Sequence, residues 1–291
     1  MIPRLRGPLG LVLSGGGAHG AWQAGVIETL HDRFGLRFDH ILSFSIGSLT
    51  GAAYFLNRLA KLNAIWKNIS RHRVLRFSPK VFPVSFYSNA ALWEVLRHAG
   101  SDEYAMVKAR CALTSIAYCV ETKKHVYSRF TPSGQNGWDG PLTARLVASC
   151  SIPRVFPPIV LKETPKQKRT YIDGGVAGND ERDPLRFDAL AECRDVLVVQ
   201  MTRPEEIGQK PPWGYLAKKL QNAREGLHGA ISKGLEPLKQ RSRRPRIFRF
   251  YPTRKLEYSM LAFESRVCIP ALFQGKHDAD YFMRNFSSYE E

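Results

Sequence analysis

Short apolar runs alternate with helical patterns over the first 61 residues. Leu9–Ser14 (LGLVLS) and Phe38–Phe44 (FDHILSF) are apolar over the length of a strand. Apolar residues in Ala21–Phe34 recur near the 3.6-residue period of a helix, and Ser48–Lys61 is also helical in pattern. The order strand, helix, strand, helix predicts an α/β fold in which a sheet is sandwiched by helices.

The rest of the chain continues this alternation less regularly. Arg71–Ser88 is basic, aromatic and interrupted by prolines, so we expect it to be irregular. Further strands are predicted at Cys111–Val120, His125–Phe130, Val160–Lys162, Thr170–Ile172, Asp195–Met201 and Ile247–Tyr251. Further helices are predicted at Asn89–His98, Leu142–Cys150, Pro184–Leu190 and Trp213–Ile231, and a closing helix is predicted within Ile269–Phe286. Since no repeat or linker interrupts the pattern, we predict one domain over residues 1–291. Its motifs lie at about 9–200, and residues 201–291 complete the fold.

The balance of charge fits an anionic partner, and it equally fits basic residues that only solubilise the surface. There are 43 Lys and Arg against 26 Asp and Glu, a formal charge of +17. The basic segments Arg71–Arg76, Lys162–Arg169 and Arg241–Arg246 favour peripheral contact with an anionic membrane surface. Nucleic acid is not expected, because the aromatic residues near Arg241–Arg246 follow a strand pattern rather than stacking spacings. The amphipathic Trp213–Ile231 could face lipid, but we favour packing on the sheet.

Other features bear on the compartment. No apolar run approaches the ~20 residues of a membrane-spanning helix, and the first residues lack the pattern of a secretory signal. The five cysteines are odd in number, widely spaced and contain no CxxC motif. This spacing favours reduced thiols over disulfides or a zinc site. We therefore expect a cytoplasmic protein with at most peripheral membrane association.

A glycine-rich loop follows the first strand. Gly15, Gly17 and Gly20 fit the pattern G-x-G-x-x-G between a strand and a helix. Such a loop offers backbone N–H groups to a pyrophosphate or to the oxyanion of an acyl-transfer intermediate. A dinucleotide site requires an acidic residue at the end of the second strand. Asp39 lies at the beginning of that strand and Ser45 follows its end, which favours the oxyanion.

Ser45 is a candidate nucleophile. It lies in Ser43-Phe44-Ser45-Ile46-Gly47, a variant of the G-x-S-x-G nucleophile elbow in which Ser43 replaces the first glycine. The other interpretation is that Ser45 only caps the following helix. Two bases are candidates: His277, in a segment that we expect to be a loop, and Asp173, at a strand end before two glycines. The residues alone leave these alternatives open.

Four blocks in order resemble the patatin-like phospholipase family. They are the glycine loop Ser14–Gly20, the elbow Ile41–Ala52 (ILSFSIGSLTGA), the segment Ala148–Pro158 (ASCSIPRVFPP) and the Asp-Gly-Gly block Tyr171–Gly175 (YIDGG). The resemblance implies a patatin-like fold with the nucleophile elbow after the second strand. It implies a Ser–Asp dyad without histidine: Ser45 as nucleophile, Asp173 as base, the N–H groups of Gly15, Gly16 and Gly17 as oxyanion hole, and Ser43 and Gly47 supporting the elbow.

The predicted function is hydrolysis of a lipid acyl ester through an acyl-enzyme, of the phospholipase A, lysophospholipase or lipase type. We expect no cofactor and no metal, since the dyad requires none and carboxylates are not clustered. Two alternatives remain: a catalytically silent lipid- or nucleotide-binding relative, and an α/β hydrolase that pairs Ser45 with His277. His19 stands where many family members carry Arg or Lys, so we assign it no contact with phosphate.

Overall fold

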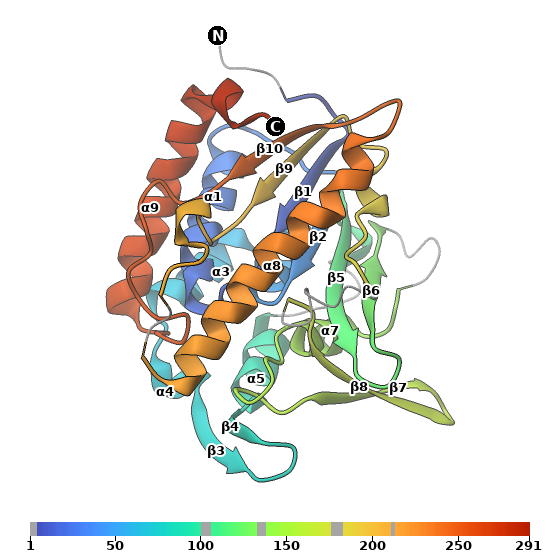
Figure 1. Cartoon of the computed structure of the whole chain (residues 1–291), viewed down its shortest axis with the longest axis vertical. Coiled ribbons are helices and arrows are strands. Elements are labelled where there is room, and N and C mark those ends of the chain that lie inside the picture. Colours follow the sequence, from blue (N-terminus) through green and yellow to red (C-terminus); the bar gives the residue numbers. More distant parts are fainter. Residues whose placement is uncertain (1–4, 100–105, 133–137, 176–182, 211–212) are drawn as a thin grey trace.

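The computed structural model describes residues 5–99, 106–132, 138–175, 183–210 and 213–291 (Figure 1). Its centre is an eight-stranded sheet in the order β10-β9-β1-β2-β5-β8-β7, with β6 paired to β5. The strands from β10 to β5 run parallel, whereas β6, β7 and β8 run antiparallel to their neighbours. Their bounds are β1 Leu9–Leu13, β2 His40–Phe44, β5 Ala112–Cys119, β6 Lys124–Phe130, β7 Ile159–Thr164, β8 Gln167–Asp173, β9 Asp195–Val199 and β10 Arg246–Phe250.

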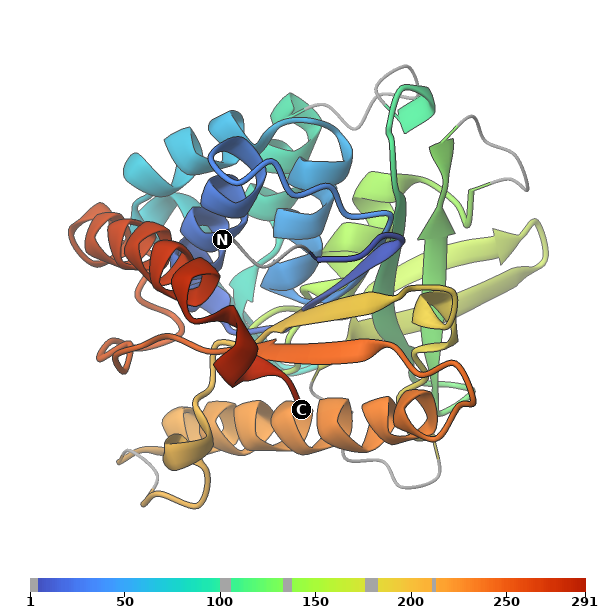
Figure 2. The ribbon, with the colours of Figure 1, turned by 90° about the horizontal axis from the view of Figure 1, so that it is seen from above.

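Helices cover both faces of this sheet (Figure 2). One face carries the long helix α8, and the other carries α1 and α9 together with the shorter helices. The bounds are α1 Gly20–Asp32, α2 Ile46–Phe55, α3 Leu59–Lys67, α4 Arg71–Val74, α5 Ala90–Ala99, α7 Leu142–Ser149, α8 Tyr215–Lys239 and α9 Ser265–Arg284. A second, two-stranded sheet is formed by β3 Arg76–Lys80 and β4 Ser85–Ser88.

Two apolar cores lie on opposite faces of the sheet. Successive side chains of a strand point to opposite faces. Leu11 and Leu13 of β1 therefore pack with α1 and α9, whereas Val12 packs with Leu227 and Ile231 of α8. The α/β sandwich predicted from the sequence is confirmed. The assignment of residues 1–291 to a single domain stays a prediction.

Two predicted segments differ from the structure in their organisation. The single helix expected at Ser48–Lys61 is two helices, because the chain turns between α2 and α3 at Asn57, which has a φ of 56°. Asn is one of the few residues that adopt this conformation at low cost. The segment Arg71–Ser88, expected to be irregular, forms α4 and the β3–β4 hairpin. All of β3 is exposed, so the apolar–polar alternation of a half-buried strand is missing.

Three predicted helices also need correction. Pro184–Leu190 forms only the short 3-10 turn Asp188–Leu190, because Leu185 and Phe187 pack against α8 from an irregular segment. The predicted helix Trp213–Ile231 is α8, which extends eight residues further, to Lys239, and leaves Trp213 outside. The closing helix α9 begins at Ser265 rather than Ile269. Its apolar face buries against the sheet and α1, as expected of an amphipathic helix.

No helix in the described ranges combines the length and the apolar character needed to cross a bilayer.

Candidate active site

Ser45 lies at a sharp turn between β2 and α2. Its backbone has φ 50° and ψ −129°, a left-handed conformation that is rare for residues other than glycine. A Cβ atom on Gly47 would lie 2.4 Å from the carbonyl oxygen of Leu13, so only glycine lets α2 start this close to β1. Ser43 is fully buried and its hydroxyl donates to the carbonyl of Thr114 at 3.1 Å. Serine therefore fits the position of the first elbow glycine by bonding to β5.

The sheet brings the end of β2 to the end of β8. β6 pairs with one edge of β5 along Leu113–Cys119, so β2 and β8 share the other edge. Phe44, the last residue of β2, lies opposite Ile116, and Asp173, the last residue of β8, lies opposite Ala117. The two strands run toward each other and end at neighbouring positions. Ser45, which directly follows Phe44, is thereby placed beside Asp173.

The end of α7 holds both residues in place. The hydroxyl of Ser149 accepts the backbone N–H of Ser45 at 3.0 Å and donates to the carbonyl of Ile116 at 2.7 Å. Two residues later, the carbonyl of Ser151 accepts the backbone N–H of Asp173 at 2.9 Å. The block Ala148–Pro158 therefore hydrogen-bonds to both candidate catalytic residues and fixes their positions relative to each other. Sequence reasoning noticed this block but gave its serines no role.

Asp173 is buried, with 2% of its surface exposed. Its Oδ1 accepts the backbone N–H of Gly175 at 2.8 Å. A Cβ atom on Gly174 would lie 2.6 Å from the carbonyl oxygen of Ile116. The two glycines after Asp173 thus let the chain turn tightly against β5 and direct a backbone donor at the carboxylate.

The glycine loop lies against Ser45. A Cβ atom on Gly15 would be 3.0 Å from the Cβ and 3.7 Å from the Oγ of Ser45. Within the described part of the chain, the backbone N–H groups of Gly15 and Gly16 donate to no other residue. Gly17 has a φ of 56°, and a Cβ atom there would lie 2.3 Å from the carbonyl oxygen of Met260. The loop therefore presents donors beside Ser45 at the start of the segment that leads into α1.

Leu227 of α8 joins the two halves of the site. Its Cδ2 is 3.4 Å from the Cβ position of Gly15 and 3.1 Å from that of Gly175. Leu227 itself is 5% exposed. An apolar side chain from the late part of the chain thus lies against both the glycine loop and the turn after Asp173.

An apolar cavity of about 150 Å³ borders Ser45 on the other side of the sheet. Its walls come mainly from α2, α3, α4 and α5 and include Leu49 and Leu62, and α7 adds Leu146. Three basic side chains also line it: Arg58, Lys61 and Arg73. Cys150 is a further lining residue, but burial and the nearby Asp173 raise the pKa of its thiol well above the ordinary value. Cys150 is therefore no competing nucleophile.

Across the residues that the structure describes, no hydrogen bond joins a histidine to Ser45. His277 was expected in a loop, but it lies within α9, its side chain is 80% exposed, and its nearest charged partner is Asp278. Ser45, by contrast, is 6% exposed. His19 is buried and donates through Nε2 to the carbonyl of Tyr258 at 2.8 Å. Burial, followed by the charge of Arg224, lowers the pKa of His19 to about 3, so it is neutral at pH 7.

His125 was missed by sequence reasoning, which treated it as an ordinary strand residue. Its Nδ1 lies 2.8 Å from Asp183 and its Nε2 lies 3.3 Å from the carbonyl oxygen of Gly174. It thus fixes the backbone next to Asp173. No spacing in the sequence relates His125 to Asp183, so the pair emerges only from the fold.

A metal site is not evident. Among the described residues, no three His, Cys, Asp or Glu side chains are grouped so that they could hold an ion.

A family model described as patatin-like phospholipase matches residues 11–185, which is more than half of the chain. The chain belongs to the patatin-like phospholipase family, as the sequence blocks predicted. The match places the chain in a family of hydrolases that act on lipid esters.

Two solved structures are similar to this chain. VipD from Legionella pneumophila is 12% identical with a TM-score of 0.42, and the alignment covers 99% of this chain and 68% of VipD. The type III effector protein ExoU is 11% identical with a TM-score of 0.46, over 99% of this chain and 55% of ExoU. The chain thus spans little more than half the length of ExoU. At these levels of similarity, neither structure assigns an activity or a substrate to it.

Proposed function

We propose that this chain hydrolyses acyl esters of lipids with a dyad of Ser45 and Asp173. The observation that carries the proposal is the meeting of β2 and β8 at Ile116 and Ala117, which sets Ser45 beside Asp173. The left-handed turn at Ser45 supports it, because this strained geometry lifts a nucleophilic hydroxyl out of the sheet edge.

The mechanism is a two-step acyl transfer. Asp173 accepts the hydroxyl proton of Ser45 as Oγ attacks the ester carbonyl carbon. The negative oxygen of the tetrahedral intermediate receives hydrogen bonds from the N–H groups of Gly15, Gly16 and Gly17. The alcohol then leaves with the proton. In the second step Asp173 deprotonates a water molecule, which attacks the acyl carbon. The bond from this carbon to Ser45 Oγ then breaks, Oγ takes the proton back from Asp173, and the fatty acid is released.

The cavity favours a particular kind of ester. Its apolar walls accommodate a hydrocarbon chain with the carbonyl at Ser45. Arg58, Lys61 and Arg73 in the lining favour a substrate that also carries negative charge. We therefore propose a phospholipid or lysophospholipid in preference to a neutral lipid.

The test is labelling by a fluorophosphonate probe and hydrolysis of a soluble short-chain ester. Wild-type protein is expected to carry the adduct on the peptide that contains Ser45. Ser45→Ala is expected to lose both labelling and hydrolysis, and Asp173→Asn is expected to lower kcat on the order of 10³-fold or more. Circular dichroism and thermal melting check that both variants are folded.

His277→Ala is the matched control. The dyad predicts near wild-type hydrolysis, because this exposed side chain lies on α9. Loss of activity in His277→Ala alone, or full activity in Ser45→Ala, would overturn the dyad. Folded wild-type protein that neither labels nor hydrolyses esters would point to a silent relative, and titration with lipid and with dinucleotides would then identify its ligand.

A further inference from the structure

Large apolar side chains are exposed on the β3–β4 hairpin. At its tip Val81 and Phe82 are 91% and 93% exposed, and Phe77 of β3 is 72% exposed. Val84 and Phe86 are also exposed. The hairpin projects from the body of the molecule next to α4 and α5 (Figure 1). Water-exposed apolar groups in this density mark a surface that is buried in contact with something else.

The hairpin is held in a fixed position. Its second strand continues into backbone hydrogen bonds with the segment after α7: Phe86 donates to the carbonyl of Arg154 and Tyr87 to that of Val155, both at 2.9 Å. The hairpin is therefore anchored through β4 to the block that also supports Ser45.

The beginning of α8 adds to the same surface. Trp213 is fully exposed and Tyr215 is 56% exposed. The guanidinium of Arg154 lies 5.0 Å from the centre of the Tyr215 ring, which places this helix end beside β4. We call the hairpin 76–88, Arg154, Trp213 and Tyr215 together the docking surface.

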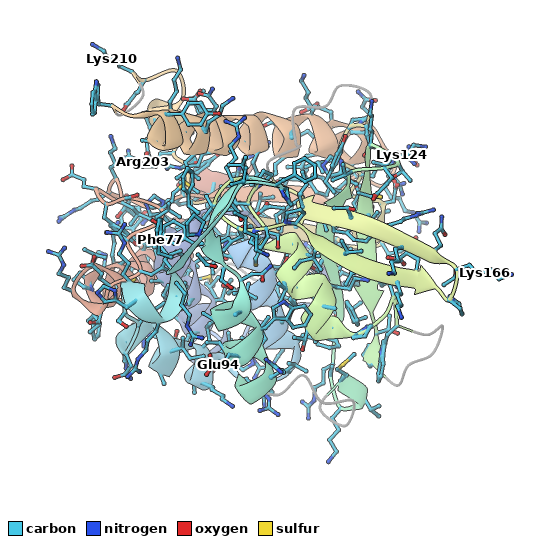
Figure 3. The ribbon with its side chains drawn as sticks, turned by 90° about the horizontal axis from the view of Figure 1, so that it is seen from below. Phe77, Glu94, Lys124, Lys166, Arg203 and Lys210 are labelled. Carbon is cyan, nitrogen blue, oxygen red and sulfur yellow. The ribbon has the colours of Figure 1, made fainter. Side chains whose placement is uncertain are left out.

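The segment that carries these apolar groups is also basic. Residues 71–88 contain four Arg or Lys and no acidic residue. The acid Glu94 of α5 is paired with Arg76 at 2.6 Å. Viewed from below (Figure 3), Phe77, Arg203 and Lys210 lie on this side of the molecule, and Lys166 lies at the tip of the β7–β8 hairpin. Apolar side chains with a basic rim complement the interior and the headgroups of an anionic bilayer.

We propose that the docking surface binds the surface of an anionic phospholipid bilayer, with Val81, Phe82 and Trp213 inserted among the lipids. The position of the hairpin in the chain gives this contact a purpose. α4 directly precedes β3 and α5 directly follows β4, and both helices line the cavity that borders Ser45. Docking brings the walls of this cavity to the membrane. That purpose rests on the proposed ester hydrolysis, whereas the binding itself does not.

Binding is measured by sedimentation with vesicles of phosphatidylcholine containing phosphatidylserine. The protein carries Ser45→Ala, so that lipid cannot be consumed. Phe82→Ser is expected to weaken partitioning about tenfold or more, since it removes one inserted aromatic side chain. Lys80→Gln is expected to weaken it about fivefold, as the loss of one well-placed positive charge. Phe273→Ser is the matched control, because Phe273 is 58% exposed on α9, outside the docking surface.

Insertion is measured with an environment-sensitive fluorophore on a single cysteine. All five native cysteines are buried, so Phe82→Cys and Phe273→Cys offer one reactive thiol each. The label at position 82 is expected to shift to the blue on vesicles, and the label at position 273 is not. The proposal would be overturned by equal partitioning of Phe82→Ser and Phe273→Ser. Absence of vesicle binding, or equal spectral shifts at both positions, would also overturn it.

Activity separates this proposal from the dyad. Phe82→Ser in the otherwise wild-type chain is expected to hydrolyse a soluble short-chain ester at the wild-type rate and vesicle phospholipid at least tenfold more slowly. If wild-type protein binds vesicles as described but neither labels at Ser45 nor hydrolyses esters, the docking surface stands and the proposed function fails. A parallel loss on both substrates would mean that Phe82 supports the site and would overturn a purely interfacial role.

Discussion

The hydroxyl of Ser149 holds the backbone of Ser45 in place. It accepts the N–H of Ser45, donates to β5 and lies 3.0 Å from the hydroxyl of Ser48. Ser48 in turn accepts from Ser115 at 3.1 Å. These serines form a fully buried chain of hydrogen bonds beneath the turn. A polar network of this kind stabilises one geometry only while every member is present.

Ser149→Ala is therefore expected to reduce both stability and activity. The variant leaves the N–H of Ser45 buried without an acceptor, at a cost of about 1–3 kcal/mol in the free energy of unfolding. The strained turn loses its anchor, so kcat for a soluble ester is expected to fall about tenfold or more while KM changes little. Urea unfolding and steady-state kinetics measure the two effects.

Ser151→Ala supplies the matched control for this prediction. Ser151 holds Asp173 through its backbone carbonyl, and its own hydroxyl donates to the carbonyl of Val147 at 2.8 Å. The substitution keeps the carbonyl, so kcat is expected to stay within about threefold of wild type. Equal losses of kcat in the two variants would contradict the role given to the Ser149 hydroxyl.

At the scale of elements, α1 and α9 are in backbone contact through two glycines. A Cβ atom on Gly25 would lie 2.1 Å from the carbonyl oxygen of Leu272, and one on Gly275 would lie 2.0 Å from that of Trp22. The indole of Trp22 also donates to Asp278 at 2.8 Å. This contact fixes α1, and with it the glycine loop from which α1 begins.

Gly275→Ala is expected to destabilise the protein by about 3 kcal/mol, because the new methyl group meets backbone rather than a flexible side chain. Gly229→Ala on α8 is its counterpart. No residue of the described ranges lies within 4 Å of that Cβ position, so alanine is expected to stabilise the helix by about 0.5–1 kcal/mol. Unfolding midpoints in urea compare the two, and similar effects of both substitutions would show that the helices separate readily.

The sequence pattern predicted the deeply buried elements and missed an exposed one. β1 and β2 lie in the centre of the sheet, and their apolar runs mark them clearly. The β3–β4 hairpin was not predicted because its apolar side chains are exposed. They therefore do not give the apolar–polar alternation of a half-buried strand. Sequence blocks also singled out Ser45 and Asp173. Their adjacency depends on the registers of β2 and of β8 along β5, two long-range pairings that no local pattern contains.

At the scale of the whole molecule, a late segment that contains Tyr258 and Met260 hydrogen-bonds to the end of the glycine loop. The N–H of Ala18 donates to the carbonyl of Met260 at 2.7 Å, and His19 donates to that of Tyr258. The His19 and Tyr258 rings also meet edge to face at 4.8 Å. These contacts require a neutral His19, because a buried imidazolium has no water to solvate it.

The free energy of unfolding is expected to fall in acid for this reason. The pKa of His19 is about 3 in the folded protein and about 6.5 in the unfolded chain. Between these values the unfolded chain binds a proton that the folded protein excludes. Stability is thus fully present above pH 6.5 and is lost as the pH falls toward 3. From pH 7.5 to 4.5, His19 alone contributes a loss of about 2 kcal/mol.

Urea unfolding at both pH values isolates this contribution by comparison with His19→Gln. Glutamine keeps a donor for Tyr258 and does not titrate, so the variant is expected to lose about 2 kcal/mol less than wild type over this range. His277→Gln changes an exposed imidazole and is expected to follow the wild type. If His19→Gln also follows the wild type, the acid sensitivity arises elsewhere.

Because Leu227 contacts both Gly15 and Gly175, the site can be completed only late in the synthesis of the chain. Ser45 is synthesised early, but β1 lacks its neighbour β9 until residue 199 has been made, and the glycine loop lacks Leu227 and Met260 for longer still. A nascent chain that stops short of residue 260 therefore carries Ser45 without the complete set of contacts that Leu227 and Met260 make with the glycine loop. Under the proposed function, a chain truncated before residue 260 is expected to show no ester cleavage, because its glycine loop is incomplete.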